Sequence, residues 1–226
     1  MYATQAKNTM LDAIGITFAS LHTAYSATGA NEVTGGSPAY ARKSATFAAA
    51  AGGSKASSNS PVFDVPAGTT VRFVGFWDAV TAGNFKGMVA NVASGGITEF
   101  EFYADLVANT ILRVAHGLVN TNKIVFYGGT PPGGLTEGTV YFVVTATADN
   151  FQVALTSGGA AIDLVAPQAT DGCVCSQIIE ETFGAQGTET VTSSTLNLNT
   201  YPRSKAMSWF RDDIDGQKAA GPGIGM

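Results

Sequence analysis

The spacing of apolar residues changes near the N-terminus from a helical period to the alternation of strands. Met10, Leu11 and Ile14 recur at helical spacing, and Gly15 is placed to end a short helix. From Ile16 to Leu21 the side chains alternate as in a half-buried strand. Most patterned segments beyond this point have a period of two. The pattern therefore predicts an all-β, antiparallel sandwich or barrel protein with one short N-terminal helix.

The first half of the chain contains short strand patterns separated by loops. Residues 24–40 are rich in Gly, Ser and Thr and predict a long polar loop, and residues 41–50 predict a strand of small residues. The clearest strand pair joins residues 62–65 to residues 70–78 through a turn at Pro66, Ala67 and Gly68.

The stretch from about residue 106 to residue 177 has the pattern of a separate unit. Four short strand patterns, each bounded by turn residues, fall at 111–114, 123–127, 140–145 and 151–155. With no helical pattern between them, they predict a small antiparallel barrel or sandwich. Residues 189–198 alternate again and predict one more strand, which has no obvious partner in this unit.

The composition excludes several classes of protein. Only 13% of the 226 residues are charged, against roughly 25% in typical soluble domains. The net charge of −5, without a basic cluster, argues against binding to nucleic acid or anionic lipid. Apolar runs such as residues 47–51 are too short to span a bilayer, so no membrane insertion is expected. Lys7, Asn8 and Asp12 interrupt the place of a secretory signal.

Two cysteines, Cys173 and Cys175, are one residue apart. They share a strand face, so a disulfide between them would be strained. A zinc site would lack two ligands, because His22 and His116 are distant in sequence. Two readings stay open: two half-buried free thiols, or disulfides to neighbouring subunits.

One long signature resembles a known family. The runs Ser20–Ala24 and Gly29–Arg42 are similar to a signature of small structural proteins of tailed bacteriophages, usually described as tail fibre or minor tail proteins. The pattern continues in a hairpin at Asp64–Val71 and Val74–Ala79, and residues 183–198 look like the closing hairpin of that family.

This resemblance implies a domain organisation and a location. A discontinuous β domain would comprise residues 1–105 and 178–200, and residues 106–177 would be an inserted barrel-like domain similar to a module of phage fibre and virion-surface proteins. The protein would be made in the host cytoplasm and reside in the virion, with other copies of itself and other virion proteins as partners. The family supplies no catalytic residues and no cofactor.

Enzyme chemistry finds little support in the sequence. Glu99 and Glu101 share one strand face and predict a solvated edge rather than two carboxyls facing across a sugar. His22 has no patterned nucleophile or acid partner and is expected to be a structural hydrogen bonder. No metal site is predicted. Trp77 and Tyr127 are candidates for stacking on a glycan, with core or interface packing as the alternative.

The segment 201–226 is polar, rich in glycine and terminal. We expect it to dock on a neighbouring subunit through Trp209 and Phe210, since a large aromatic pair can fill a partner's pocket. The alternative is that it folds back on its own domain.

The sequence therefore predicts a non-enzymatic structural component of a phage virion. It would assemble as a homo-oligomer in the tail, neck, collar or fibre apparatus. One alternative is a capsid decoration or head-fibre protein. Another is a module that binds host surface polysaccharide, and a glycan hydrolase is the least expected.

Overall fold

Strands make up most of the regular structure in the computed structural model, which describes residues 3–169, 171–192 and 194–197. The helix α1 (Thr4–Asp12) begins six residues before Met10, the first residue of the predicted apolar period, because the good helix formers Gln5, Ala6 and Lys7 precede it. Leu11 is its buried residue, and Asp12 forms an ion pair with Lys55 at 3.0 Å. The all-β prediction with one short helix is confirmed.

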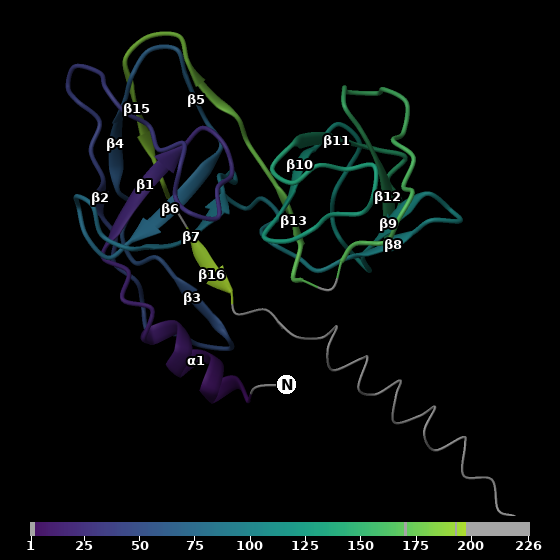
Figure 1. Ribbon diagram of the computed structural model, residues 1–226, viewed down its shortest axis with the longest axis horizontal. Helices are drawn as coiled ribbons and strands as arrows, with labels where there is room; N and C mark the ends of the chain where they lie inside the picture. The colour runs from purple at the N-terminus through teal and green to yellow at the C-terminus, as the bar shows by residue number, and fades with distance from the viewer. Residues whose placement is uncertain (1–2, 170, 193, 198–226) are drawn as a thin grey trace, which may run out of the picture.

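The strands fall into two lobes (Figure 1). The helix-bearing lobe contains β1 (Phe18–His22), β2 (Lys43–Ser44), β3 (Ser54–Ala56), β4 (Val62–Val65), β5 (Thr69–Val71), β6 (Phe73–Trp77), β7 (Phe85–Ala90), β14 (Glu181–Phe183), β15 (Gly187–Thr190) and β16 (Thr195–Asn197). The six-stranded lobe contains β8 (Tyr103–Asp105), β9 (Thr110–Leu112), β10 (Lys123–Tyr127), β11 (Val140–Val144), β12 (Asn150–Ala154) and β13 (Val174–Gln177).

The central sheet of the helix-bearing lobe has the order β2-β1-β6-β7, and all of its strand pairs are antiparallel. Its two faces differ, because successive side chains of a strand point to opposite sides. On one face Leu21, Val74 and Phe76 pack against Phe63 and Val65 of β4. The opposite face is considered below, since it carries the polar residues of β1.

The predicted hairpin between residues 62–65 and 70–78 is wrong in its pairing. β4 pairs with β15 and β5 pairs with β14, all antiparallel, so the turn at Pro66–Gly68 joins strands of two different ladders. The same finding corrects the predicted closing hairpin, because β14 and β15 do not pair with each other. It also supplies the partner of the strand near residue 189, which is β4. Residues 41–50 are mostly irregular, with only β2 as a strand.

The six-stranded lobe has the order β13-β10-β11-β12-β9-β8. Its two edges are linked by one connecting segment: Phe100 bridges Cys175 of β13, and Tyr103 pairs with Leu112 of β9. The sheet therefore curls on itself around a cluster of buried side chains that includes Phe126 and Phe151. β8 ends at residue 105, the last residue before the predicted insertion, yet it pairs with β9. The division into domains stays a prediction.

Strand β10 is buried on both of its faces. Ile124 and Phe126 point into the core of the six-stranded lobe, while Val125 and Tyr127 belong to a second cluster together with Phe73 of β6. This continuous apolar run is the sequence signature of a strand covered on both sides. The two lobes thus share a hydrophobic cluster at their junction.

Candidate functional site

A chain of hydrogen bonds lies on the second face of the central sheet. The Trp77 Nε1–H donates to Ser20 Oγ at 2.8 Å, Ser20 Oγ lies 2.7 Å from His22 Nε2, and His22 Nδ1 lies 2.8 Å from the Ala30 carbonyl oxygen. The indole can only donate and the carbonyl can only accept. His22 therefore carries its proton on Nδ1 and accepts from the serine hydroxyl.

This network has the atoms of a nucleophile and base but not their setting. Ser20 and His22 are fully buried, and burial lowers the pKa of His22 against the opposing effect of its bond to Ala30. A serine nucleophile must reach a substrate, whereas this hydroxyl is covered by Gly75 on the neighbouring strand. The arrangement is that of a structural hydrogen-bonding group.

Arg42 covers the tryptophan end of the network. Its guanidinium carbon lies 3.4 Å from the centroid of a Trp77 ring, and its Nε and NH2 groups donate to Glu32 at 2.9 and 2.8 Å. Its NH1 group donates to the carbonyl oxygens of Ala79 and Ala82. The planar fork of an arginine suits this combination of stacking and bidentate pairing.

Five residues that make these contacts come from the segments that carry the sequence resemblance. We call Ser20, His22, Glu32, Arg42 and Trp77 the buried clasp. Its five side chains pin the long loop 24–40 to the sheet. Sequence reasoning missed the pairing of Glu32 with Arg42, although charges are few in this chain and each one is therefore informative.

The two predicted glycan contacts are buried. Trp77 is 8% exposed and Tyr127 is 2% exposed, so neither ring offers an open face to a sugar, and the predicted stacking contact is not available at these residues. Tyr127 instead packs edge-on against Phe73 with ring centroids 5.6 Å apart. Core packing, the alternative, describes both residues.

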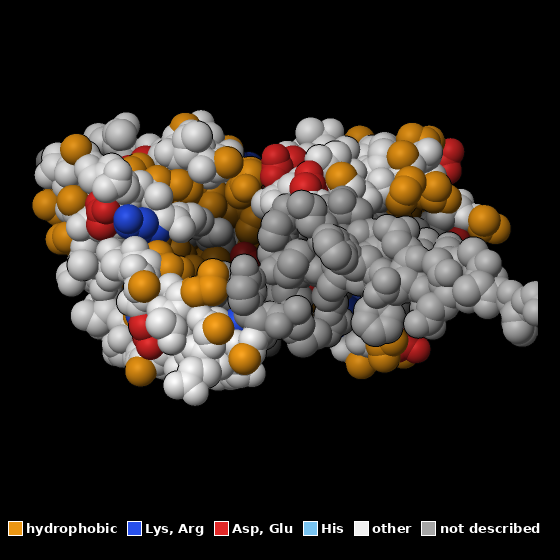
Figure 2. Space-filling model, turned by 60° about the horizontal axis from the view of Figure 1, so that its bottom comes forward, with side chains coloured by type: hydrophobic (Ala, Val, Ile, Leu, Met, Phe, Trp, Pro, Cys, Tyr) orange, Lys and Arg blue, Asp and Glu red, His pale blue; other side chains and the backbone are white. Residues whose placement is uncertain are grey.

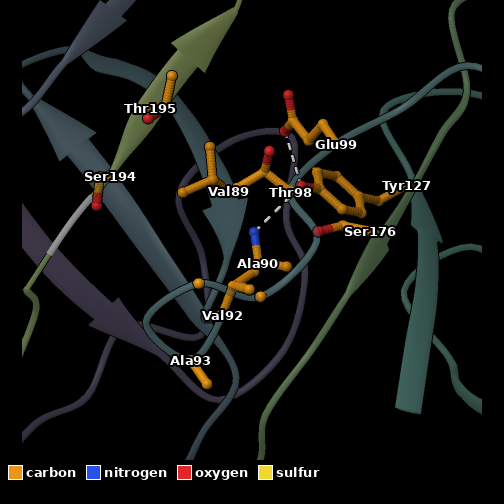
Figure 3. Close-up of a pocket in the computed structure, with 12 residues that line it drawn as sticks. Val89, Ala90, Val92, Ala93, Thr98, Glu99, Tyr127, Ser176, Ser194 and Thr195 are labelled. Atoms are coloured by element: carbon orange, nitrogen blue, oxygen red, sulfur yellow. Dashed lines mark hydrogen bonds between the residues drawn. The ribbon is translucent and has the colours of Figure 1, made fainter. Parts of the chain in front are cut away.

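The prediction of a solvated edge is wrong for Glu99. The Tyr127 hydroxyl donates to Glu99 Oε1 at 2.7 Å and accepts from the Ala90 backbone N–H at 3.1 Å (Figure 3). Burial raises the pKa of Glu99. A cavity of about 50 Å³ lies beside this carboxyl and is lined in part by Thr98 and Ser176.

Both cysteines are buried free thiols. Cys175 is fully buried and Cys173 is 8% exposed. Burial raises the pKa of Cys173 to about 12 and raises that of Cys175 well above its ordinary value. Disulfide exchange needs an accessible thiolate, so disulfides to neighbouring subunits find no support in this environment and stay a prediction. The proposed anchor residues Trp209 and Phe210 lie outside the described residues.

A second, more open hollow is polar. It measures about 390 Å³ and lies beside Thr34, Thr69, Arg72 and Glu32. Neither Trp77 nor Tyr127 lines it. The two aromatic residues predicted to stack on a glycan are therefore not part of this hollow.

Exposed apolar side chains are unevenly distributed. In the described part of the chain the helix-bearing lobe exposes Met10, Val62 and Val80, whereas the six-stranded lobe exposes Tyr103, Leu106, Val107, Val114, Val119, Leu155 and Val165. Figure 2 shows such side chains on the visible face of both lobes, with few charges between them. Large exposed apolar side chains are thus more numerous on the six-stranded lobe.

The described residues contain neither a metal-binding cluster nor a helix that could span a membrane. No group of three or more His, Cys, Asp or Glu side chains among them could hold a metal ion. No helix in residues 3–169, 171–192 or 194–197 is long and apolar enough to cross a membrane.

Comparison with known proteins gives one match. Residues 5–101, under half of the 226, match the family described as Podophage GP4 fiber I protein gp80. No curated protein and no solved structure matches the chain. The matched range contains α1 except for Thr4, all of β1–β7, and every residue of the buried clasp. The minor-tail identity and the inserted module stay predictions. The N-terminal part of this chain is thus similar to a phage fibre family, which supports a structural role in the virion and association with other virion proteins.

Proposed function

We propose that this chain is a non-enzymatic structural component of the phage tail, neck, collar or fibre apparatus and that it works by homo-oligomeric assembly. The observation that carries the proposal is the match of residues 5–101 to a phage fibre family. The matched segment folds around the buried clasp. The polar residues of the clasp hold the fold together and do not face a substrate. A family of fibre proteins suggests a mechanical role in place of catalysis.

The surface of the protein supports assembly. Charged residues are 13% of the chain, and interface cores are depleted in charge. Val107, in the turn between β8 and β9, is fully exposed, and Tyr103 at the start of β8 is half-exposed. A lone subunit would leave these apolar groups in water, whereas contacts with other virion proteins or other copies would bury them.

We propose that the C-terminal extension, residues 201–226, forms the contact between subunits. The last described element, β16, pairs with β3 of the helix-bearing lobe, so the extension follows directly from this lobe. Trp209 and Phe210 would fill a pocket on the neighbouring copy, as buried aromatic anchors do in other interfaces.

Removal of residues 201–226 is expected to convert a defined oligomer to smaller species. The measurement is light scattering coupled to gel filtration, at several protein concentrations. Trp209→Ala with Phe210→Ala should reproduce the effect, because these rings carry the contact. Asp212→Asn with Asp213→Asn, a matched change in the same segment, should leave the oligomer intact. A full-length protein that is monomeric throughout would contradict the proposal.

A further inference from the structure

The junction between the lobes has an apolar part and a polar part. Phe73, Met88 and Ala90 of the helix-bearing lobe pack against Val125 and Tyr127 of β10. This apolar contact alone would hold the lobes together, because buried apolar area favours association at any pH. The polar part is different, since it contains a group that titrates.

The polar part runs through a single tyrosine. The Ala90 N–H, from β7, donates to the Tyr127 hydroxyl at 3.1 Å, and this hydroxyl donates to Glu99 at 2.7 Å. Glu99 belongs to the segment that connects β7 to β8. Figure 3 shows these groups converging beside the cavity. One hydrogen-bond chain therefore joins β7, the connecting segment and β10.

Glu99 is held in an environment that disfavours its charge. Burial raises its pKa, and the hydrogen bond from Tyr127 opposes this effect without cancelling it. The adjoining cavity of about 50 Å³ has hydroxyls of Thr98, Ser176 and Thr195 in its lining. It has room for only a small number of water molecules, so a carboxylate ionised in the closed junction is hydrated less than one in open solvent.

Two other titratable groups lie at this junction, Glu180 and Tyr25. Glu180 lies 2.7 Å from Arg72 and 2.6 Å from Lys123; burial alone would raise its pKa, but these two cations outweigh burial and hold it below its ordinary value. Burial raises the pKa of Tyr25, which faces Tyr127.

Glu189 of β15 is a second, partly buried acid. It lies 3.4 Å from the side-chain amide of Asn91, and burial raises its pKa as well. It contacts neither Tyr127 nor Ala90 through any described hydrogen bond. Glu189 therefore serves as the comparison residue for Glu99.

We propose that Glu99 is a proton-controlled latch between the two lobes. With the carboxyl protonated the junction is closed and tight, and with the carboxylate ionised the junction loosens locally around Tyr127. The proton comes from solvent and returns to it, and no covalent bond changes. The junction would hold the two lobes more rigidly in acid and less rigidly near neutral pH.

The direction of the pH dependence follows from the linkage between proton binding by Glu99 and closure of the junction. A carboxyl that binds its proton more tightly in the closed junction than in the open one stabilises the closed form when it is protonated. This stabilisation is complete below the ordinary pKa of 4.5 and is lost as the pH rises through the higher value in the closed junction. Glu180 gives the opposite dependence, because its ion pairs are lost as the pH falls below 4.5.

Amide hydrogen exchange of the full chain tests the latch. The reporters are the N–H groups of Ala90, bonded to Tyr127, and of Ile179, bonded to the Asn91 carbonyl. The reference amides are Val33 and Val143, each bonded within one lobe. After correction for intrinsic rates, protection of the two reporters should fall as the pH rises from 4.5 to neutral, while the references stay constant.

Variants assign the effect to Glu99. Glu99→Gln, which mimics the protonated form, should abolish the pH dependence of both reporters, and Glu189→Gln should retain it. If reporters and references respond alike, or if Glu99→Gln keeps the fall in protection, the proposal is overturned.

A second variant covers the case in which Glu99→Gln does not fold. Tyr127→Phe removes the hydrogen bond that favours the ionised carboxyl, so the fall in Ile179 protection should move to higher pH. A fall at unchanged pH in this variant would equally overturn the latch.

Discussion

Gly75→Ala is expected to lower the midpoint of thermal unfolding by roughly 10 °C, which corresponds to a loss of about 3 kcal/mol in a protein of this size. Gly75 lies opposite Ser20 in the register of β1 and β6. A Cβ atom there would lie 2.6 Å from Ser20 Oγ and still closer to His22 Nε2. Neither neighbour can move away without breaking a hydrogen bond of the buried clasp.

Gly184→Ala is the matched control for this change. A Cβ at Gly184 would meet no atom within 4 Å, and the backbone there is not in the left-handed region. This variant should unfold within a degree or so of the wild type, since an alanine without new contacts restricts the unfolded chain slightly. Equal destabilisation by the two substitutions would show that the clasp does not depend on close approach at Gly75.

Arg42→Ala is expected to cost about 3 kcal/mol in the free energy of unfolding. The Arg42 and Glu32 side chains are only 11% and 19% exposed. Removal of the guanidinium would leave the Glu32 carboxylate largely buried and without its cation, and Trp77 would lose the group that covers it. The measurement is urea unfolding, read as the change in midpoint at constant slope.

Two further variants interpret the result. Lys43→Ala breaks an ion pair whose side chains are 35% and 30% exposed, and it should cost less than about 1 kcal/mol. Arg42→Lys should recover only part of the loss, because an ammonium cannot pair bidentately and stack at once. If Arg42→Ala is no more damaging than Lys43→Ala, the pair with Glu32 contributes nothing to the fold.

The sequence predicted the positions of the strands well and the pairing between strands poorly. The runs at β10, β11 and β12 alternate or are continuously apolar, so local pattern located them to within a residue or two. The pairing of β4 with β15 joins residues more than a hundred positions apart. No local period encodes such a contact, and the turn residues Pro66–Gly68 favoured the nearer partner.

The local sequence pattern also did not show which polar groups would be buried. Glu99 has the spacing of a solvated edge, yet the junction closes over it through Tyr127, a residue 28 positions later. Arg42 and Glu32 meet only because loop 24–40 folds back on the sheet. The aromatic residues Trp77 and Tyr127 offered two readings from the sequence, and three-dimensional packing selected the interior for both.

We propose that this protein is a structural part of a phage particle, at a fixed position on its tail or neck. Its copy number and location in purified virions test this most directly, by quantitative mass spectrometry together with labelling of the particles by polyclonal antibodies raised against the purified protein. We expect copies in a multiple of three, consistent with rotational assembly, clustered at the tail or neck. Hundreds of copies spread over the head would place it among capsid decoration proteins, and absence from purified particles would contradict the claim.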